Sequence, residues 1–321
     1  MLNFVYWPIS FVLWFWHRVL GFVMDPNWGV TWALAIVLLT FTIRALLLKP
    51  TINSMRSMRK MQELAPQMQE IREKYKNDPQ KMAEETRKLQ KESGSSPLGG
   101  CLPMLVQMPV FLGLFHVLRS FNRTGTGPGA LGMSVEENRN TANYFFSPAD
   151  VQSFLDARFF GVPLSAYISM PTDQYAAFGG DLTRTRIAVV AAPFILIIAF
   201  ATHMNARISV ERQKMRIASG KQKAPEGDQM QMTSDMMNKM MLWFMPLTIL
   251  FTGFVWHIGL LSYMMSNNIW TFFQQRYVFN KMDAEEEAEI AAKKAANAAS
   301  KPKVGQKPNN PKKQSKGKKQ Q

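Results

Sequence analysis

Apolar residues in this chain gather into long unbroken runs that are separated by strongly charged stretches. Five of these runs approach the length of roughly 20 residues that a helix needs to cross a bilayer. A helix exposed to water would carry a polar stripe along one side, and these runs mostly lack one. The pattern therefore predicts five transmembrane helices, over residues 30–48, 98–118, 187–204, 240–256 and 258–273.

The segments between the runs complete the prediction of an all-α polytopic membrane protein. Residues 49–97 have the pattern of two charged helices, with a turn signal at Asn77, Asp78 and Pro79. We expect a five-helix transmembrane core with a helical hairpin in the cytoplasm. The other expected segments are an N-terminal hydrophobic segment over 1–29, an extracytoplasmic loop over 119–186, a cytoplasmic loop over 205–239, and a cytoplasmic helix with a disordered basic tail over 274–321.

The first arm of the predicted hairpin carries a narrow apolar seam. Met61, Leu64, Met68, Ile71 and Tyr75 recur at intervals of three and four residues, as in a coiled coil. The seam can simply join the two arms. Methionine is also flexible and polarizable, which suits contact with varied apolar partners. The second interpretation makes client-contact candidates of Met55, Met58, Met61, Met68 and Met82.

Residues 1–24 form a hydrophobic and aromatic segment whose relation to the membrane the pattern leaves open. If the segment is helical after Pro8, then Ser10, His17, Arg18 and Gly21 fall close to one stripe, with large apolar residues around the rest. That arrangement favours a helix lying in the membrane interface, where Trp and Tyr are also enriched. An additional spanning helix, acting as an uncleaved signal anchor, is the alternative.

The loops differ in positive charge in a way that fixes the predicted orientation. Lys and Arg number eleven in residues 49–97, seven in 205–239 and twelve in 274–321. The 68-residue segment 119–186 has six arginines and no lysine. Because positively charged loops stay in the cytoplasm, the start of the first span faces out and the C-terminus lies in the cytoplasm.

The sequence offers no candidate for catalysis, for a metal site or for a cofactor. Its single cysteine, Cys101, rules out an internal disulfide framework, and the four histidines lie far apart without metal-ligand spacing. No nucleophile elbow, phosphate-binding glycine loop or zincin motif is present. An enzyme is therefore disfavoured, and no small-molecule ligand is expected. A small-molecule or ion transporter is the main alternative, although the spans show no matching pair of interrupted helices.

Several polar residues lie within the predicted spans, toward their cytoplasmic ends. Arg44 lies four residues before the end of the first span and is either a snorkelling side chain or a functional charge. Taken one at a time, such residues more often join helices through hydrogen bonds than line a cavity. Their presence on several helices favours a shared hydrated groove, with the candidate residues Thr40, Arg44, Gln107, Ser266, Asn267, Thr271 and Gln274.

Two stretches make the pattern specific. Residues 97–118, PLGGCLPMLVQMPVFLGLFHVL, form a proline-bearing span that follows a charged hairpin, and the final span contains SYMMSNNIWTFFQQ with its Asn and Gln pairs. Together with the position of Arg44, these resemble the YidC/Oxa/Alb family of membrane protein insertases, most closely its actinobacterial members, over roughly residues 25–280. The chain departs from the family pattern at Ser96, where Asn is frequent, and at Met264 after Tyr263.

The resemblance implies a groove in the bacterial plasma membrane that is open to cytoplasm and lipid and contains one positive charge. Newly made membrane proteins would enter the bilayer through it, with or without the Sec translocon. The tail supplies one further expected partner. Residues 301–321 contain eight lysines and no acidic residue, so they can hold the C-terminus inside, bind anionic lipid, or contact ribosomal RNA.

Overall fold

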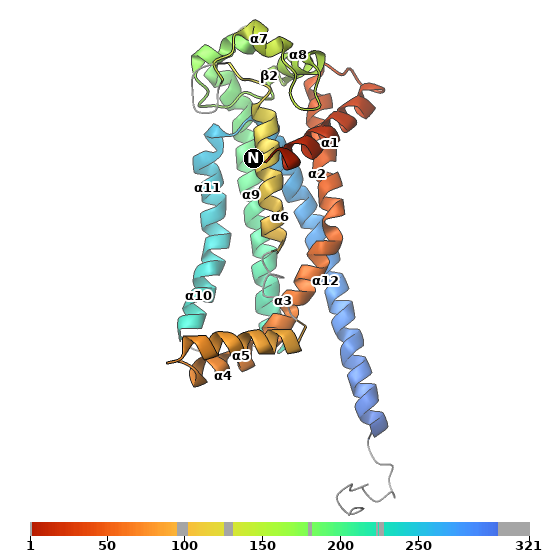
Figure 1. The fold of residues 1–321 in the computed structure, drawn as a ribbon, viewed down its shortest axis with the longest axis vertical. Helices are drawn as coiled ribbons and strands as arrows, with labels where there is room; N and C mark the ends of the chain where they lie inside the picture. The colour runs from red at the N-terminus through yellow and green to blue at the C-terminus, as the bar shows by residue number, and fades with distance from the viewer. Residues whose placement is uncertain are drawn as a thin grey trace, which may run out of the picture. The chain divides into compact units, whose positions relative to one another are not determined.

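The structure is a computed structural model that describes residues 2–94, 102–124, 131–178, 182–222, 224 and 228–300. The chain divides into two compact units, Met1–Gln274 and Gln275–Gln321, and each is considered by itself. The first unit contains the helical bundle, the hairpin and the predicted extracytoplasmic loop, 119–186, which is called the outer loop below (Figure 1). The basic tail, residues 301–321, lies outside the described residues, as do residues 98–101 at the start of the second predicted span.

The chain begins with two packed helices, α1 (Asn3–Gly21) and α2 (Gly29–Leu46). Helix α1 also packs against α6 and crosses both helices obliquely near the end of the bundle that carries the outer loop (Figure 1). Helix α1 begins at Asn3, earlier than expected, so Pro8 lies inside it. Of the polar stripe predicted for this segment, Ser10 and His17 are buried against the protein, whereas Arg18 is exposed. Large apolar side chains face outward instead, at Phe4, Trp7, Phe11, Phe15 and Phe22.

The segment after α2 forms the predicted helical hairpin. Its first arm consists of α3 (Leu48–Glu63) and α4 (Ala65–Lys74), because the chain is interrupted at Leu64 and Pro66 opens the new helix. The second arm is α5 (Pro79–Glu92), which packs against α4. Asp78 caps α5 by accepting a hydrogen bond from the Lys81 amide at 3.1 Å. The sequence signal for this turn therefore corresponds to a real N-cap.

Helices correspond to all five predicted spans. These are α2, α6 (Leu102–Arg119), α9 (Arg184–Ala218), α11 (Met245–Thr252) with the turns around it, and α12 (Ile258–Ser300). By length and hydropathy alone, three described segments qualify as membrane-crossing: Gly29–Leu46, Arg184–Ala218 and Gln231–Val255. The spans 98–118 and 258–273 therefore stay predictions. The second of them is less apolar because it carries serine, asparagine and threonine.

The helices around the fourth predicted span are longer than the apolar run. Helix α10 (Asp228–Lys239) continues through a π-helical turn, η2 (Met240–Phe244), into α11. A short 3₁₀ turn, η3 (Gly253–Val255), follows, and Trp256 takes an extended conformation before α12 starts. Helix α11 packs against α9. Gly253 is required at that contact, because a Cβ there would lie only 2.8 Å from the side chain of Ile195.

The outer loop is folded rather than irregular. It contains α7 (Val135–Asn140), α8 (Pro148–Asp156), the antiparallel strands β1 (Arg158–Phe159) and β2 (Val162–Pro163), and the 3₁₀ helix η1 (Thr172–Phe178), gathered at one end of the bundle (Figure 1). Phe121 stacks on Phe154 at a centroid distance of 4.0 Å, and Trp32 of α2 meets the edge of the same ring at 5.0 Å. The loop thus has its own aromatic core, which is continuous with that of the helices.

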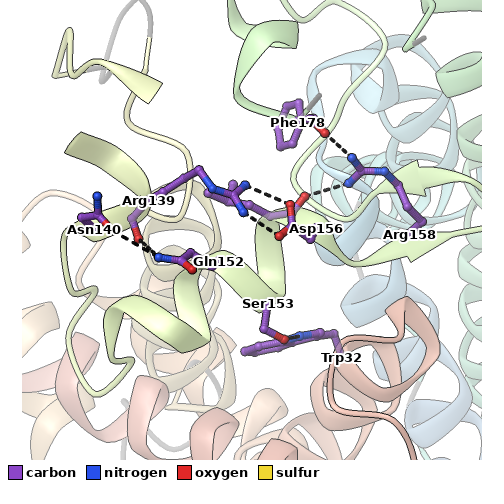
Figure 2. A network of polar contacts seen from close by, with 9 residues as sticks. Trp32, Arg139, Asn140, Gln152, Ser153, Asp156, Arg158 and Phe178 are labelled. Carbon is purple, nitrogen blue, oxygen red and sulfur yellow. Dashed lines mark hydrogen bonds and ion pairs between the residues drawn. The ribbon is translucent and has the colours of Figure 1, made fainter. Parts of the chain in front are cut away.

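Polar contacts tie the parts of the outer loop together (Figure 2). Arg139 of α7 forms a bidentate pair with Asp156 of α8 at 2.9 and 2.6 Å. Arg158 donates to the backbone carbonyl of Phe178, which fixes β1 to η1. The indole of Trp32 donates to the Ser153 hydroxyl at 3.2 Å, which joins α2 to α8. These contacts hold the loop together at this end of the helices.

Candidate functional site

The predicted intramembrane charge, Arg44, lies in the last turn of α2 and contacts α12. Its Nε donates a hydrogen bond of 2.8 Å to Oδ1 of Asn267, and its Nη2 donates to the same oxygen. The side chain is half-buried. The structure therefore brings together two of the residues expected to line one groove, although they are 223 positions apart in the sequence.

The guanidinium of Arg44 is held by a neutral amide. Among the residues that the structure describes, no carboxylate forms an ion pair with it. An amide oxygen fixes the direction of the guanidinium without cancelling its charge, and five N–H donors are more than one oxygen can use. Arg44 therefore keeps both a positive charge and donor capacity for an acidic group.

A second cross-helix pair lies one helical turn away. Nε2 of Gln107 on α6 donates to the hydroxyl of Tyr263 on α12, with 2.5 Å between the two atoms. Tyr263 and Asn267 are four residues apart, so they share a face of α12 with Thr271. That face is therefore joined both to α6, through Gln107, and to α2, through Arg44. The sequence analysis did not select Tyr263 as a groove candidate.

Three predicted hydroxyls are satisfied within their own helices. Thr40 donates to the carbonyl of Ile36 at 2.7 Å, Ser266 to that of Ser262 at 2.7 Å, and Thr271 to that of Asn267 at 2.8 Å. Thr40 and Ser266 are buried, with exposed fractions of 1% each. Back-bonding of this kind removes the cost of placing a hydroxyl among apolar helices. Thr271 remains half-buried on the face of Asn267.

Gln274 extends the same region by one further turn. Its Oε1 accepts a hydrogen bond from the indole of Trp270, and the ring of Trp270 lies 5.4 Å from that of Phe41 on α2. The contact between α2 and α12 is therefore polar at Arg44 and aromatic at Phe41. Both residues lie near the end of α2 that leads into the hairpin.

Asn268, next to Asn267, has a different role that the sequence analysis did not assign. Its Oδ1 accepts hydrogen bonds from Thr202, at 3.2 Å, and from Asn205, at 3.1 Å, both on α9. Successive residues of a helix point about 100° apart, so an asparagine pair can serve two neighbours. The pair in SNN therefore joins α12 to α2 through one amide and to α9 through the other. The two adjacent asparagines were the sequence signal that could have indicated these two roles.

The hairpin methionines are mostly half-buried. Met55, Met61, Met68 and Met82 are half-buried, and Met58 is exposed to 42%. Helices α4 and α5 pack together, which agrees with a seam that joins the two arms, and Met58 is the accessible member of the set. A more exposed group of methionines, not singled out from the sequence, lies on α10 and η2 at Met232, Met236, Met237, Met240 and Met241.

The histidines take part in packing. His116 bonds to the hydroxyl of Tyr144 at 2.7 Å and stacks on Tyr6, while His203 bonds to the carbonyl of Leu242 at 2.7 Å. Within the described ranges, no group of three or more His, Cys, Asp or Glu residues is placed to hold a metal ion.

Comparison with known proteins gives a consistent result. A sequence model of the family described as 60Kd inner membrane protein matches residues 23–286. Two similar proteins named membrane protein insertase YidC come from Mycobacterium tuberculosis H37Rv, 45% identical over 96% of this chain and 80% of that protein, and from Mycolicibacterium paratuberculosis K-10, 43% identical over 96% and 83%. A third, from Streptomyces avermitilis, is 31% identical over 87% of this chain and 58% of that protein. These relatives are actinobacterial, as the sequence resemblance predicted.

Proposed function

Because the chain belongs to the 60Kd inner membrane protein family, in which the YidC insertases are found, we propose that it helps newly made proteins to enter and fold in the membrane. The family and its apolar helices make the chain a membrane-integral protein. The clients are nascent membrane proteins that carry an apolar segment and a short polar end. A transporter function is not favoured by the comparisons.

The observation that carries the mechanism is the amide-held charge of Arg44. Its contact with Asn267 orients the guanidinium between α2 and α12, and within the described part of the chain no carboxylate neutralises it. We propose that this charge lies in a hydrated groove that is open to the cytoplasm and to lipid. An acidic residue at the client's polar end would be attracted there, because Coulomb interactions are stronger in low dielectric than in water.

The free energy for insertion comes from the client itself. Transfer of an apolar segment from water to lipid is favourable by about 0.8 kcal/mol per buried CH₂ group. The cost lies in passing the client's polar end across the apolar layer. A fixed positive charge and water within the groove lower this cost for an acidic end. The proposed mechanism therefore involves no bond-making step and no nucleotide.

The remaining partners follow from the chain's charge pattern. We propose a location in the bacterial plasma membrane with the C-terminus in the cytoplasm, because the segments with most Lys and Arg alternate with the lysine-free segment 119–186. The lipid bilayer is a partner throughout. The Sec translocon and the ribosome are proposed partners that act before or beside the insertion step, and insertion by the purified protein alone would separate its own action from theirs.

The test is insertion of a short single-span client into liposomes that contain the purified protein. We expect the client's polar end to become protected from external protease. Arg44→Ala should reduce insertion of a client with an acidic end by about tenfold, which corresponds to about 1.4 kcal/mol. Insertion of a client with a neutral end should fall much less. Arg44→Lys should retain part of the activity, because it keeps the charge but loses the two-donor contact with Asn267.

Matched variants separate charge from packing. Asn267→Ala removes the partner of Arg44 but keeps its charge, so we expect a smaller loss than for Arg44→Ala. Equal dependence of acidic and neutral clients on Arg44 would contradict direct attraction. An ion flux through the same liposomes, without client insertion, would favour the channel alternative.

A further inference from the structure

A small cavity lies on the outer side of the protein, where three separate segments meet. It is lined by the end of α6 (Arg119), the residues that follow it (Asn122), the segment after β2 (Ser165 and Tyr167), and the turn between η3 and α12 (His257). The cavity volume is about 10 Å³, which is enough for one water-sized particle. It is separate from the region of Arg44 and plays no part in the proposed insertion step.

The segments around the cavity are joined by backbone hydrogen bonds. The amide of Ile258 donates to the carbonyl of Ala166 at 3.1 Å, and the amide of Gly259 donates to that of Leu164 at 2.8 Å. The ring of His257 meets Tyr167 edge-on at 4.9 Å. The cavity walls are therefore held in place by the packing of the outer loop on the start of α12.

Three buried polar atoms at this cavity lack a hydrogen-bond partner in the described part of the chain. They are Nδ2 of Asn122, Oγ of Ser165 and Nδ1 of His257. Ser165 and His257 are exposed to only 2% and 5%. A buried polar group without a partner costs about 1–3 kcal/mol, so three such atoms around one space indicate a bound species that satisfies them.

The chemistry of the lining favours a negative species. Oδ1 of Asn122 already accepts hydrogen bonds from the amide and the hydroxyl of Thr124, at 3.2 and 2.7 Å. The amide of Asn122 is therefore oriented, and its Nδ2 can only donate. The hydroxyls of Ser165 and Tyr167 can donate as well, and the guanidinium of Arg119 adds a positive charge. Among the described residues, none that lines the cavity is a carboxylate; Asp173 is exposed and acts electrostatically on Tyr167.

We propose that this cavity binds one monatomic anion of the size of chloride. The small volume, about 10 Å³, suits a single-atom ion. The anion would accept hydrogen bonds from Asn122 and Ser165 and would be attracted by Arg119. Because these residues come from different segments, its binding would fasten the outer loop to the turn between η3 and α12. The site would thereby stabilise the outer closure of the helical bundle.

The test is the dependence of thermal unfolding of the purified full-length protein on halide at constant ionic strength. We expect the midpoint to rise saturably when sodium gluconate is replaced by sodium chloride or bromide, because a ligand that binds only the folded state stabilises it. Arg119→Gln and Ser165→Ala should each lose most of this rise. Arg184→Gln, which removes a positive charge from the exposed start of α9, is the matched control and should keep it.

A direct measurement complements the unfolding experiment. Crystals grown in bromide should show an anomalous scattering peak within hydrogen-bond distance of Asn122 Nδ2 and Ser165 Oγ. A halide effect that does not saturate, or one that is equal in wild type and in Ser165→Ala, would overturn the proposal. A peak of water density without anomalous signal at this position would also overturn it. If Arg119→Gln fails to fold, the Ser165→Ala comparison decides.

Discussion

Single side chains decide which helices touch in this protein. Arg44 reaches α12 through two hydrogen bonds to Asn267, Gln107 reaches it through one, and the amide oxygen of Asn268 joins α12 to α9. In a membrane, such contacts replace the hydrophobic force that drives helices together in water. Three of the residues selected as groove candidates, Arg44, Asn267 and Gln107, are therefore also helix-joining residues. The client assay with acidic and neutral ends is what separates the two roles of Arg44.

His257 gives a prediction for pH. It lies in the turn between η3 and α12, outside the predicted spans, and complete burial lowers its pKa from the usual 6.5 to about 3. The nearby charge of Arg119 lowers the pKa further in the same direction. The folded protein therefore holds His257 neutral, while the unfolded chain binds a proton below pH 6.5.

The sign of the effect follows from this difference. The stability linked to His257 is fully present above pH 6.5 and is lost progressively as the pH falls from 6.5 toward 3. Between pH 7 and pH 5 the loss is about 2 kcal/mol. We expect thermal unfolding in halide-free buffer to show a larger drop for wild type than for His257→Gln. An identical drop in both proteins would show that His257 is not the group responsible.

Helices α9 and α12 are longer than the apolar runs that reveal them. The run 187–204 lies inside α9, which extends from Arg184 to Ala218, and most of the predicted cytoplasmic loop 205–239 is helical in α9 and α10. Polar ends of a helix carry no periodic apolar signal, so hydropathy finds only the part surrounded by lipid. The π-helical turn η2 adds a second effect, because it rotates the face that α11 presents relative to α10.

The hairpin gives a prediction at the scale of an element. We propose that its methionines contact clients, and Met58 is the exposed member of the set. A photo-reactive amino acid at Met58 should capture a nascent client severalfold more than one at Glu73, an exposed and charged position of the same hairpin. Half-buried Met68 tests the packing role of the seam, because Met68→Ser should weaken the contact between the two arms of the hairpin. Equal capture at Met58 and Glu73 would contradict client contact.

At the scale of the whole molecule, the outer loop and the hairpin differ in the chemistry of their side chains. The outer loop has an aromatic core around Phe121 and Phe154 and contributes no lysine. The hairpin segment, 49–97, carries eleven Lys or Arg residues. Gly29 shows how closely the loop is fitted, because a Cβ at this position would overlap the backbone of Arg158. The loop is therefore part of the folded bundle.

The basic tail gives a prediction for the whole protein. We propose that residues 301–321 lie in the cytoplasm and bind ribosomal RNA through their eight lysines. Replacing these lysines with glutamine should weaken binding to ribosomes and reduce its dependence on salt, because fewer counterions are released. Insertion into liposomes without ribosomes should stay unchanged. Stronger loss of binding to anionic vesicles than to ribosomes would instead assign the tail to lipid headgroups.

Much of the fold was predictable from the sequence because apolar length and loop charge are local properties. The helices that match the predicted spans, the hairpin turn at Asp78 and the family resemblance at residues 97–118 were all read from short stretches. Arg44 and Asn267 were selected separately, as polar residues in apolar surroundings. The sequence placed both residues in one groove but did not predict the hydrogen bonds between them.

The sequence by itself determined the fold class, the helix positions and the polar residues that a membrane makes costly. Only the tertiary structure decided which of these residues meet, that Ser10 and His17 of α1 are buried against the protein, and that the outer loop packs an aromatic core on Trp32. The physical reason is one of range. Hydropathy and charge act along the chain, whereas a hydrogen bond between residues 223 positions apart depends on how whole helices pack.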